Sequence, residues 1–238
     1  MEKLRLVLVE VEGAINLGMI ARLAENFEVD EFYLVNPKAS LEEAREYAVR
    51  AAHRLDSARI VSSLDEALRG ADLSVCTSAR SSERDPLRVA VPPRRVAELA
   101  AGIEGVVALV MGRESVGLTR RELEKCQVLS SIPSSPRYPA LNLANATAIY
   151  LYELYLARRG SPKPLGDVKY ARLVEAYTRA LAQVLIGDEK RRNDVIVGLR
   201  RLAMLNLERE RDVKLLLYLL SRACNRIEGC SVEVPPDV

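Results

Sequence analysis

The chain has 238 residues, of which 49% are hydrophobic and 29% are charged, and its formal net charge is +2. This balance excludes an intrinsically disordered chain and is typical of a soluble globular protein. No stretch reaches about 18 uninterrupted apolar residues, and Met1 is followed directly by a strand pattern, so we expect no membrane span, no signal peptide and a cytoplasmic location.

Four cysteines and one histidine limit the metal and redox chemistry that the chain can support. The cysteines are scattered and form no CxxC pair, so we expect no metal site. Cys224 and Cys230 are close enough in sequence to pair, but we expect free thiols because a cytosol is reducing. With His53 as the only histidine, no Ser-His-Asp hydrolase site is convincing.

The first part of the chain alternates between strand and helix patterns. Short apolar and β-branched runs predict strands at 4–10, 31–35, 59–61 and 72–76. Apolar residues at helical spacing predict helices at 17–27, 41–55 and 63–69. The last of these helices opens with Ser63 and Glu66 in the spacing of a capping box.

The alternation continues up to residue 158. A polar loop at 81–91 is followed by a helix at 94–101, a strand at 106–111, a short helix at 120–125 and a strand at 128–132. The segment 134–139 is too rich in proline to be a helix or a central strand. The helix predicted at 141–156 is apolar almost all round and should therefore be buried. Together these elements predict an α/β domain with a mainly parallel sheet and helices on both faces.

A helical extension follows this α/β domain, which we place at 1–160. The segment 161–166 carries prolines and glycine and is interpreted as a linker. Beyond it, 167–238 shows three amphipathic helix patterns. Residues 161–238 hold 14 Lys and Arg against 11 Asp and Glu, a net charge of +3, whereas the remainder has a net charge of −1. This mildly basic extension permits a polyanionic partner without requiring one.

Polar motifs occur where predicted strands end and helices begin. They are Asn16-x-Gly-x-x-x-Arg22, Thr77-Ser-Ala-Arg80, Gly112-x-Glu-x-x-Gly117 and Asn142 at the start of the last helix of the domain. Each alone has a plain structural interpretation as a turn, a cap or a surface charge. Open α/β sheets, however, bind ligands at the carboxyl ends of their strands. Neither GxGxxG nor a Walker A motif is present, which disfavours an NAD enzyme or a P-loop ATPase.

Taken in this order, the motifs resemble those of the TrmH (SpoU) branch of the SPOUT superfamily of methyltransferases. The matching residues are Asn16, Gly18 and Arg22, then Met111-Gly-Arg-Glu-Ser-Val-Gly117, then Leu141-Asn-Leu-Ala-Asn-Ala146. The resemblance covers about residues 4–158. The Thr77–Arg80 stretch, the Ile132-Pro-x-x-Pro-x-Tyr138 approach and the helical extension resemble those members of the branch that methylate a ribose 2′-oxygen of tRNA.

The resemblance implies a fold that periodicity alone does not reveal. Family members tuck their C-terminal segment through a loop and form a deep trefoil knot, a known exception to the rule that chains do not thread loops. In this chain the knot would span about 106–156. Family members are also homodimers whose active site lies close to the subunit interface.

The resemblance further implies S-adenosyl-L-methionine as the cofactor and tRNA as the substrate, with a pyrimidine at position 32 of the anticodon loop as the target. By position, the catalytic candidates are Arg22, Asn142, Asn16 and Glu114. The cofactor would be held by Thr77, Ser78, Ala79, Gly112, Ile132, Pro139, Ala140, Leu141 and Asn142. The RNA would meet Arg22, Arg80, Arg84 and Arg88.

A guanidinium is nearly always protonated, so we interpret Arg22 as an electrostatic clamp on the developing alkoxide or on a phosphate, and we leave the general base open. Asn142 would orient the ribose or the cofactor, Asn16 would hold the first loop of the site, and Glu114 would orient a loop or the substrate. One departure from the family pattern is Ala140, where a serine often precedes the Leu-Asn pair, so this chain lacks that hydroxyl.

Two alternatives stay open at this point. One is a related methyltransferase that acts on ribosomal RNA or on another tRNA position. The other is an RNA-binding protein on the same fold that has no catalytic activity, although the presence of Arg22, Glu114 and Asn142 argues against it.

Overall fold

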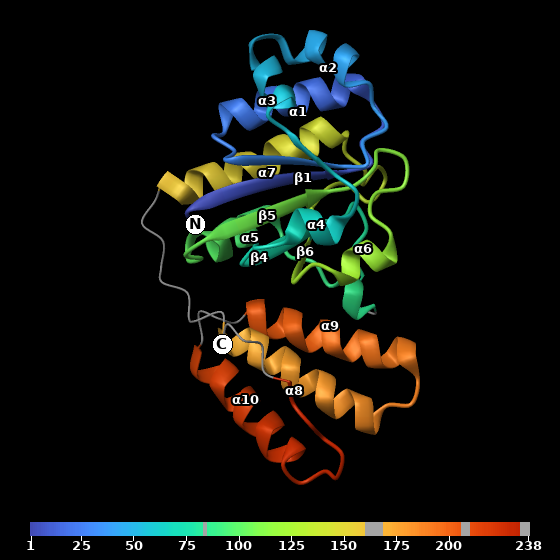
Figure 1. Cartoon of the computed structure of the whole chain (residues 1–238), viewed down its shortest axis with the longest axis vertical. Helices are drawn as coiled ribbons and strands as arrows, with labels where there is room; N and C mark the ends of the chain where they lie inside the picture. Colours follow the sequence, from blue (N-terminus) through green and yellow to red (C-terminus); the bar gives the residue numbers. More distant parts are fainter. Residues whose placement is uncertain (83–84, 160–168, 206–209, 234–238) are drawn as a thin grey trace. The chain divides into compact units, whose positions relative to one another are not determined.

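The computed structural model describes residues 1–82, 85–159, 169–205 and 210–233. These residues form two compact units (Figure 1). The first unit draws on Met1–Ser81 and Ala90–Pro162, and the second on Ser82–Val89 and Lys163–Val238. The linker predicted at 161–166 lies outside the described residues, and the predicted domain boundaries stay a prediction.

A six-stranded sheet forms the centre of the first unit, and all of its strand pairs are parallel. The strand order is β3-β2-β1-β5-β4-β6, which confirms the predicted α/β class with a parallel sheet. The strands are β1 (Lys3–Val9), β2 (Glu31–Val35), β3 (Arg59–Val61), β4 (Leu73–Thr77), β5 (Val106–Met111) and β6 (Val128–Ser130).

Helices cover both faces of this sheet, as the sequence predicts (Figure 1). On one face α7 (Leu143–Arg159) packs against α1 (Ala14–Asn26) and α5 (Pro93–Ala101). On the other face α4 (Leu64–Leu68) and α6 (Arg120–Glu124) share one buried apolar cluster with the strands. The strands β1 and β5 lie at the centre, and nearly all of their residues are buried, as expected for a parallel sheet that is covered on both faces.

The helix predicted at 41–55 is interrupted. It consists of α2 (Leu41–Ala48), a 3₁₀ turn η1 (Val49–Ala51) and α3 (Ala52–Asp56). The interruption lies at Val49, whose φ of 53° is incompatible with a continuing right-handed helix. Close packing of α2 on α1 explains Gly18 in the first motif, since a Cβ there would lie 2.4 Å from the carbonyl oxygen of Ala44.

The prediction that the long apolar helix is buried all round is wrong for the single chain. Leu151 and Leu154 of α7 are buried against the sheet, but Ile149, Tyr152 and Leu156 are exposed. These three residues recur at spacings of three and four, so they form one face of the helix. The sequence pattern was apolar on both sides because α7 carries a second apolar face in addition to its core face.

The expectation of free thiols is also wrong, because the structure contains disulfides between Cys76 and Cys126 and between Cys224 and Cys230. Cys76 lies in β4 and Cys126 comes just before the neighbouring strand β6, so the sheet brings their Cα atoms to 5.6 Å. The Cα atoms of the other pair are 5.3 Å apart. Both distances are typical of disulfides.

The second unit contains the helices α8 (Lys169–Leu185), α9 (Glu189–Leu205) and α10 (Glu210–Cys224), and α8 packs against both others. The segment Ser82–Val89, which follows β4 in the chain, packs with these helices through a 3₁₀ turn η2 (Pro86–Arg88). Leu87 is buried there, and the guanidinium of Arg201 donates to the carbonyl oxygen of Pro86 at 3.0 Å.

Candidate functional site

The sheet order brings the predicted motifs to one edge. β1, β5, β4 and β6 are consecutive neighbours, so the segments that leave their carboxyl ends lie side by side. These segments carry the start of α1, the turn Gly112–Gly117, the stretch Thr77–Arg80 and the approach to α7. This is the edge at which open α/β sheets bind ligands.

Three of the predicted catalytic residues form one chain of hydrogen bonds. The amide nitrogen of Asn142 donates to the side-chain oxygen of Asn16 at 2.9 Å. The amide nitrogen of Asn16 donates to the carboxylate of Glu114, also at 2.9 Å. One residue from each of the three motifs is therefore fixed relative to the others, although Asn16 and Asn142 are 126 positions apart.

Asn142 also caps α7. Its side-chain oxygen accepts from the backbone nitrogens of Ala144 at 2.9 Å and Asn145 at 3.3 Å. The oxygen of the amide therefore satisfies the helix start, while the nitrogen holds Asn16. Asn142 can therefore serve as the cap of α7 and as a residue of the site at the same time.

The loop before α1 and the turn after β5 hold each other. The carboxylate of Glu114 accepts from the backbone nitrogens of Glu12 at 2.9 Å and Gly13 at 3.0 Å. In return, the carboxylate of Glu12 accepts from the backbone nitrogen of Ser115 at 3.1 Å and from its hydroxyl at 2.8 Å. Our sequence analysis did not assign a role to Glu12 or Ser115. The sequence signal that could have indicated them is their position near the motif residues Asn16 and Glu114.

The residues predicted to hold a cofactor at β4 and β5 lie next to one another. The hydroxyl of Thr77 donates to the carbonyl oxygen of Val110 at 2.9 Å. The backbone nitrogen of Ser78 donates to the carbonyl oxygen of Ser130, also at 2.9 Å. Gly112 lies where the turn folds back on itself, because a Cβ there would be 2.5 Å from the carbonyl carbon of Gly117. Thr77 and Gly112 are buried, Ser78 is half-buried and Ala79 is exposed.

The remaining cofactor candidates belong to the segment between β6 and α7. Ile132 is half-buried, whereas Pro139, Ala140 and Leu141 are exposed, as is Asn142. The hydroxyl of Ser134 donates to the carbonyl oxygen of Pro139 at 2.9 Å, which closes this segment into a loop. Ile132 and Leu141 thus provide apolar side chains beside the polar edge, a composition that suits a nucleoside.

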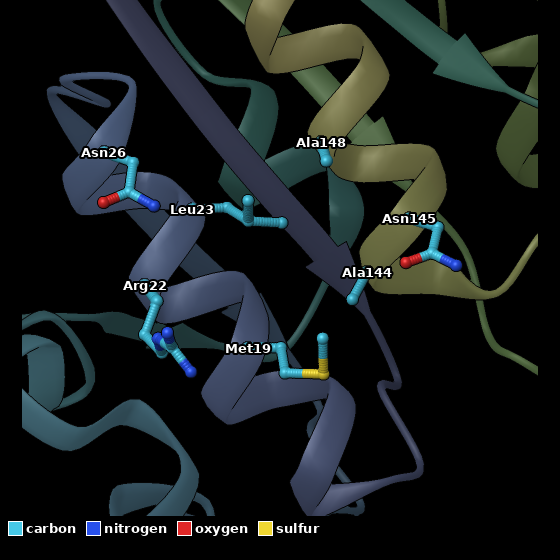
Figure 2. A pocket seen from close by; sticks show the side chains of 7 residues that line it. All are labelled: Met19, Arg22, Leu23, Asn26, Ala144, Asn145 and Ala148. Atoms are coloured by element: carbon cyan, nitrogen blue, oxygen red, sulfur yellow. The ribbon is translucent and has the colours of Figure 1, made fainter.

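Arg22 is not part of this hydrogen-bonded chain. It lines a pocket of about 170 Å³ between α1 and α7, together with other side chains of these helices (Figure 2). Among the described residues it has no hydrogen-bond or ion-pair partner. The complete lining is Met19, Arg22, Leu23, Asn26, Ala144, Asn145 and Ala148.

The arginines predicted to meet RNA fall in different parts of the chain. Arg80 is exposed in the first unit. Arg88 belongs to the second unit, where its guanidinium lies 3.8 Å from the carboxylate of Asp85. Arg84 lies outside the described residues.

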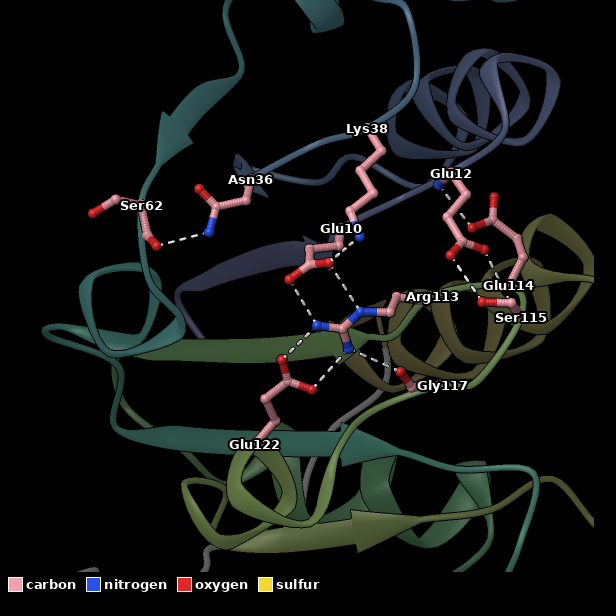
Figure 3. A network of polar contacts seen from close by, with 10 residues as sticks. All are labelled: Glu10, Glu12, Asn36, Lys38, Ser62, Arg113, Glu114, Ser115, Gly117 and Glu122. Atoms are coloured by element: carbon pink, nitrogen blue, oxygen red, sulfur yellow. Dashed lines mark hydrogen bonds and ion pairs between the residues drawn. The ribbon is translucent and has the colours of Figure 1, made fainter.

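A partly buried ion cluster that our sequence analysis did not predict lies beneath the turn Gly112–Gly117 (Figure 3). The guanidinium of Arg113 contacts the carboxylates of Glu10, at the end of β1, and Glu122, in α6, each at 2.9 Å. The ammonium of Lys38 lies 2.6 Å from Glu10. Three strand-end segments and one helix are thereby joined by charged groups.

This cluster makes a prediction about pH. Hydrogen bonds from Arg113 and then Lys38 lower the pKa of Glu10 from 4.5 to about 2. A carboxyl whose pKa is lowered in the folded state stabilises it fully above pH 4.5 and loses that contribution as the pH falls toward 2. We expect the free energies of unfolding of wild type and Glu10→Gln to differ most at neutral pH and to converge toward pH 2. Urea denaturation across this range measures the difference, and a gap that does not change with pH would contradict the assignment.

Within the described ranges, no group of three or more His, Cys, Asp or Glu side chains is arranged to hold a metal ion. The same residues contain no helix with the length and apolar character needed to cross a membrane.

Comparison with known proteins identifies close relatives. The model of the SpoU rRNA Methylase family matches residues 3–152. A tRNA (cytidine-2′-O-)-methyltransferase TrmJ from Sulfolobus acidocaldarius is 35% identical over 226 residues, which cover 94% of each chain. A tRNA (cytidine/uridine-2′-O-)-methyltransferase TrmJ from Pectobacterium atrosepticum is 40% identical over 66% of each chain. The structure of a probable methylase family protein from Haemophilus influenzae has a TM-score of 0.68 at 29% identity, covering 96% of this chain and 99% of that one.

Proposed function

We propose, because the chain belongs to the SpoU rRNA Methylase family, that it transfers the methyl group of S-adenosyl-L-methionine to a ribose 2′-hydroxyl of tRNA. The observation that carries this proposal is the hydrogen-bonded chain from Glu114 through Asn16 to Asn142. It joins the three family motifs at the ligand-binding edge of the sheet. The relative from Sulfolobus, which matches over 94% of both chains, supports tRNA as the substrate.

The residues at this edge fit S-adenosyl-L-methionine. Thr77, Ser78 and Ala79 leave β4 beside Gly112 and Ile132, which follow the neighbouring strands β5 and β6. They offer backbone nitrogens and carbonyl oxygens together with an apolar side chain, and an adenosine needs both kinds of contact. The loop Pro139–Asn142 completes the set and is exposed, so a ligand can reach it.

When bound, S-adenosyl-L-methionine supplies an electrophilic methyl group: the ribose oxygen bonds to the methyl carbon, the sulfur keeps the electrons of the broken bond, and the hydroxyl proton passes to the surroundings. Asn142 orients the ribose or the cofactor, with its own amide fixed by Asn16 and by the helix start. Arg22 stabilises the developing charge on the oxygen or an adjacent phosphate. Because the displacement requires an in-line approach, positioning by these residues provides much of the acceleration.

The target that we propose is the ribose of the pyrimidine at position 32 in the anticodon loop. The Sulfolobus relative is named for a cytidine and the Pectobacterium relative for cytidine or uridine, and a pyrimidine includes both. A loop nucleotide can be turned out toward the protein, whereas the ribose of a paired one is less accessible. Arg80, Arg84 and Arg88 provide the phosphate contacts, which makes binding sensitive to salt. With tRNA as its substrate, the protein would act in the cytoplasm.

Transfer of labelled methyl groups tests this function. The protein is incubated with labelled S-adenosyl-L-methionine and either an unmodified tRNA transcript or a ribosomal RNA fragment, and the product is hydrolysed with alkali. A 2′-O-methyl group prevents cleavage of the adjacent phosphodiester, so we expect label in alkali-resistant dinucleotides from tRNA alone. Label in mononucleotides would mean base methylation, and label in the ribosomal fragment alone would replace tRNA as the substrate.

We also propose that the protein acts as a homodimer through one surface of α1 and α7, which we call the α1–α7 surface. On α1 the exposed residues Ile15, Met19 and Arg22 recur at spacings of four and three, and they share one face. The exposed apolar residues of α7, which are Ile149, Tyr152 and Leu156, form the other half. Exposed apolar side chains on two adjacent helices are typical of a protein interface, and their burial in a dimer accounts for the two apolar sides of α7. The pocket that contains Arg22 would then lie at the interface.

Replacing Ile149 by aspartate tests the dimer. A carboxylate on the α1–α7 surface would have to be desolvated on association, so we expect a monomer with greatly reduced methyl transfer. Ile60→Asp makes the same change at an exposed isoleucine of β3 outside this surface and should leave both properties intact. Sedimentation velocity gives the oligomeric state. A wild-type protein that is monomeric while active would contradict the proposal.

The trefoil knot over about 106–156 is a further part of the proposal. Its support is the path of the chain: β6 is an edge strand, yet α7, which follows it, packs against both α5 and α1. The chain must therefore return from the edge of the sheet toward its centre, as the family's threaded segment does.

A further inference from the structure

Arg113 occupies the position between Gly112 and Glu114 in the second motif, and the proposed mechanism gives it no role. Its side chain points away from the hydrogen-bonded chain of Glu114, toward the ion cluster beneath the turn (Figure 3). The two consecutive residues therefore fix the turn from opposite sides. Glu114 holds it to the start of α1, and Arg113 holds it to β1 and α6.

All three guanidinium nitrogens of Arg113 donate hydrogen bonds to carboxylates. Two of its nitrogens donate to the two carboxylate oxygens of Glu122, both at 2.9 Å. Its Nε donates to Glu10 at 3.2 Å. A lysine cannot reproduce this set of contacts, because an ammonium is a single charge without the planar fork.

Arg113 also closes the turn on itself. Its backbone carbonyl oxygen accepts from the nitrogen of Gly117 at 3.0 Å, while its guanidinium donates to the carbonyl oxygen of Gly117 at 3.1 Å. The backbone of Gly112 already packs too closely on Gly117 to admit a Cβ. Arg113 therefore links the two ends of the turn Gly112–Gly117 directly, in addition to holding the turn to Glu10 and Glu122.

The surroundings make this anchor strong. The side chain of Arg113 is 10% exposed and that of Glu122 is 16% exposed, so water screens the pair weakly. Hydrogen bonds that the guanidinium of Arg113 donates to Glu122 and then to Glu10 raise the pKa of Arg113, so it remains charged. Charge-assisted, bidentate contacts of this kind fix geometry as well as contribute energy.

We propose that Arg113 is a positioning residue that sets the affinity for the cofactor by holding the turn Gly112–Gly117 in its binding shape. This rests on the proposed function, in which Gly112 contacts the cofactor. In that function the side chain of Arg113 contacts Glu10, Glu122 and Gly117 and neither reactant. Its loss should therefore weaken binding of the cofactor much more than it slows transfer from the bound cofactor.

The test is Arg113→Lys, with S-adenosylhomocysteine, the demethylated product, as the probe for binding by titration calorimetry. We expect Kd for the probe and KM for S-adenosyl-L-methionine to rise about tenfold, as for the loss of one charge-assisted hydrogen bond, while kcat changes by less than about threefold. A milder second variant, Glu10→Gln, should raise both constants in the same direction by a smaller factor while leaving the contacts with Glu122 in place.

Arg5→Lys is the matched control. Arg5 pairs with Glu31 at 2.6 Å, donates to the carbonyl oxygens of Ala67 and Arg69, and is as buried as Arg113, but it lies in β1 away from its carboxyl end. We expect this control to lower the melting temperature without changing Kd for the probe. Equal losses of binding in Arg5→Lys and Arg113→Lys would overturn the proposal, as would unchanged binding in Arg113→Lys. Absence of binding by the wild-type protein would instead refute the proposed function.

Discussion

Replacement of Asn142 by alanine is expected to reduce methyl transfer by about 100-fold or more, the usual cost of removing a positioned donor from an active site. The amide of Asn142 holds Asn16 through its nitrogen, and alanine leaves that contact unmade. Alanine also removes the cap of α7, which costs about 1 kcal/mol of stability. Initial rates at saturating S-adenosyl-L-methionine and tRNA measure the first effect, and thermal unfolding measures the second.

Asn142→Asp separates these two effects. An aspartate keeps an oxygen that can accept from Ala144 and Asn145, so the cap and the stability should be retained. It has no side-chain nitrogen to donate to Asn16, so methyl transfer should still be lost. Wild-type activity in Asn142→Asp would mean that Asn142 serves only as a helix cap, and the site assignment would then fail.

Replacement of Arg22 by alanine is the second change for which we expect a large effect. We expect kcat to fall by about 100-fold or more, because the developing negative charge loses its cationic partner. The stability of the single chain should be unaffected, since Arg22 has no hydrogen-bond or ion-pair partner among the described residues of its own chain. Sedimentation velocity checks that the dimer is retained, because Arg22 lies on the α1–α7 surface. Binding of S-adenosylhomocysteine should also persist, because none of the proposed cofactor contacts comes from Arg22.

Two further variants make the result for Arg22 specific. Arg22→Lys keeps the charge but loses the planar fork, so we expect partial activity. Arg50→Ala removes another exposed arginine of the same unit, outside the α1–α7 pocket, and should behave as wild type. Full activity in Arg22→Ala would exclude this residue from catalysis, and equal losses in Arg22→Ala and Arg50→Ala would indicate a general effect of charge on RNA binding.

The sequence was sufficient to predict which polar residues share an edge of the sheet. Asn16, Glu114 and Asn142 each follow or precede a predicted element, and the ends of parallel strands meet at one edge. Their hydrogen bonds depend on the strand order, in which β1 lies next to β5. Periodicity does not determine strand order, so the resemblance of the motifs was needed to connect the three residues.

Other features could not be predicted because they depend on contacts between distant segments. Arg113 looked like one more polar residue in a turn, since Glu10 and Glu122 reach it only in the folded sheet. The disulfide between Cys76 and Cys126 forms because β4 and β6 are neighbours, which the spacing of the cysteines does not reveal. The packing of Ser82–Val89 with the C-terminal helices has no sequence signal, because a short polar loop carries no periodicity.

The exposed face of α7 illustrates a different limit. The sequence predicted a helix buried all round, and in the single chain Ile149 and Tyr152 are exposed. A sequence pattern reports every apolar face, but it does not say whether the chain itself or a second copy covers that face. The homodimer proposed for the α1–α7 surface accounts for this difference.

The proposed activity is methylation of the ribose 2′-oxygen of nucleotide 32 in tRNA. The most direct measurement compares transfer of labelled methyl groups from S-adenosyl-L-methionine into two tRNAs that differ only in a 2′-deoxy sugar at that nucleotide. We predict incorporation into the ribose-containing tRNA and none into the deoxy form. Equal incorporation into both would contradict the claim, because the methyl group would then be on another nucleotide or on a base.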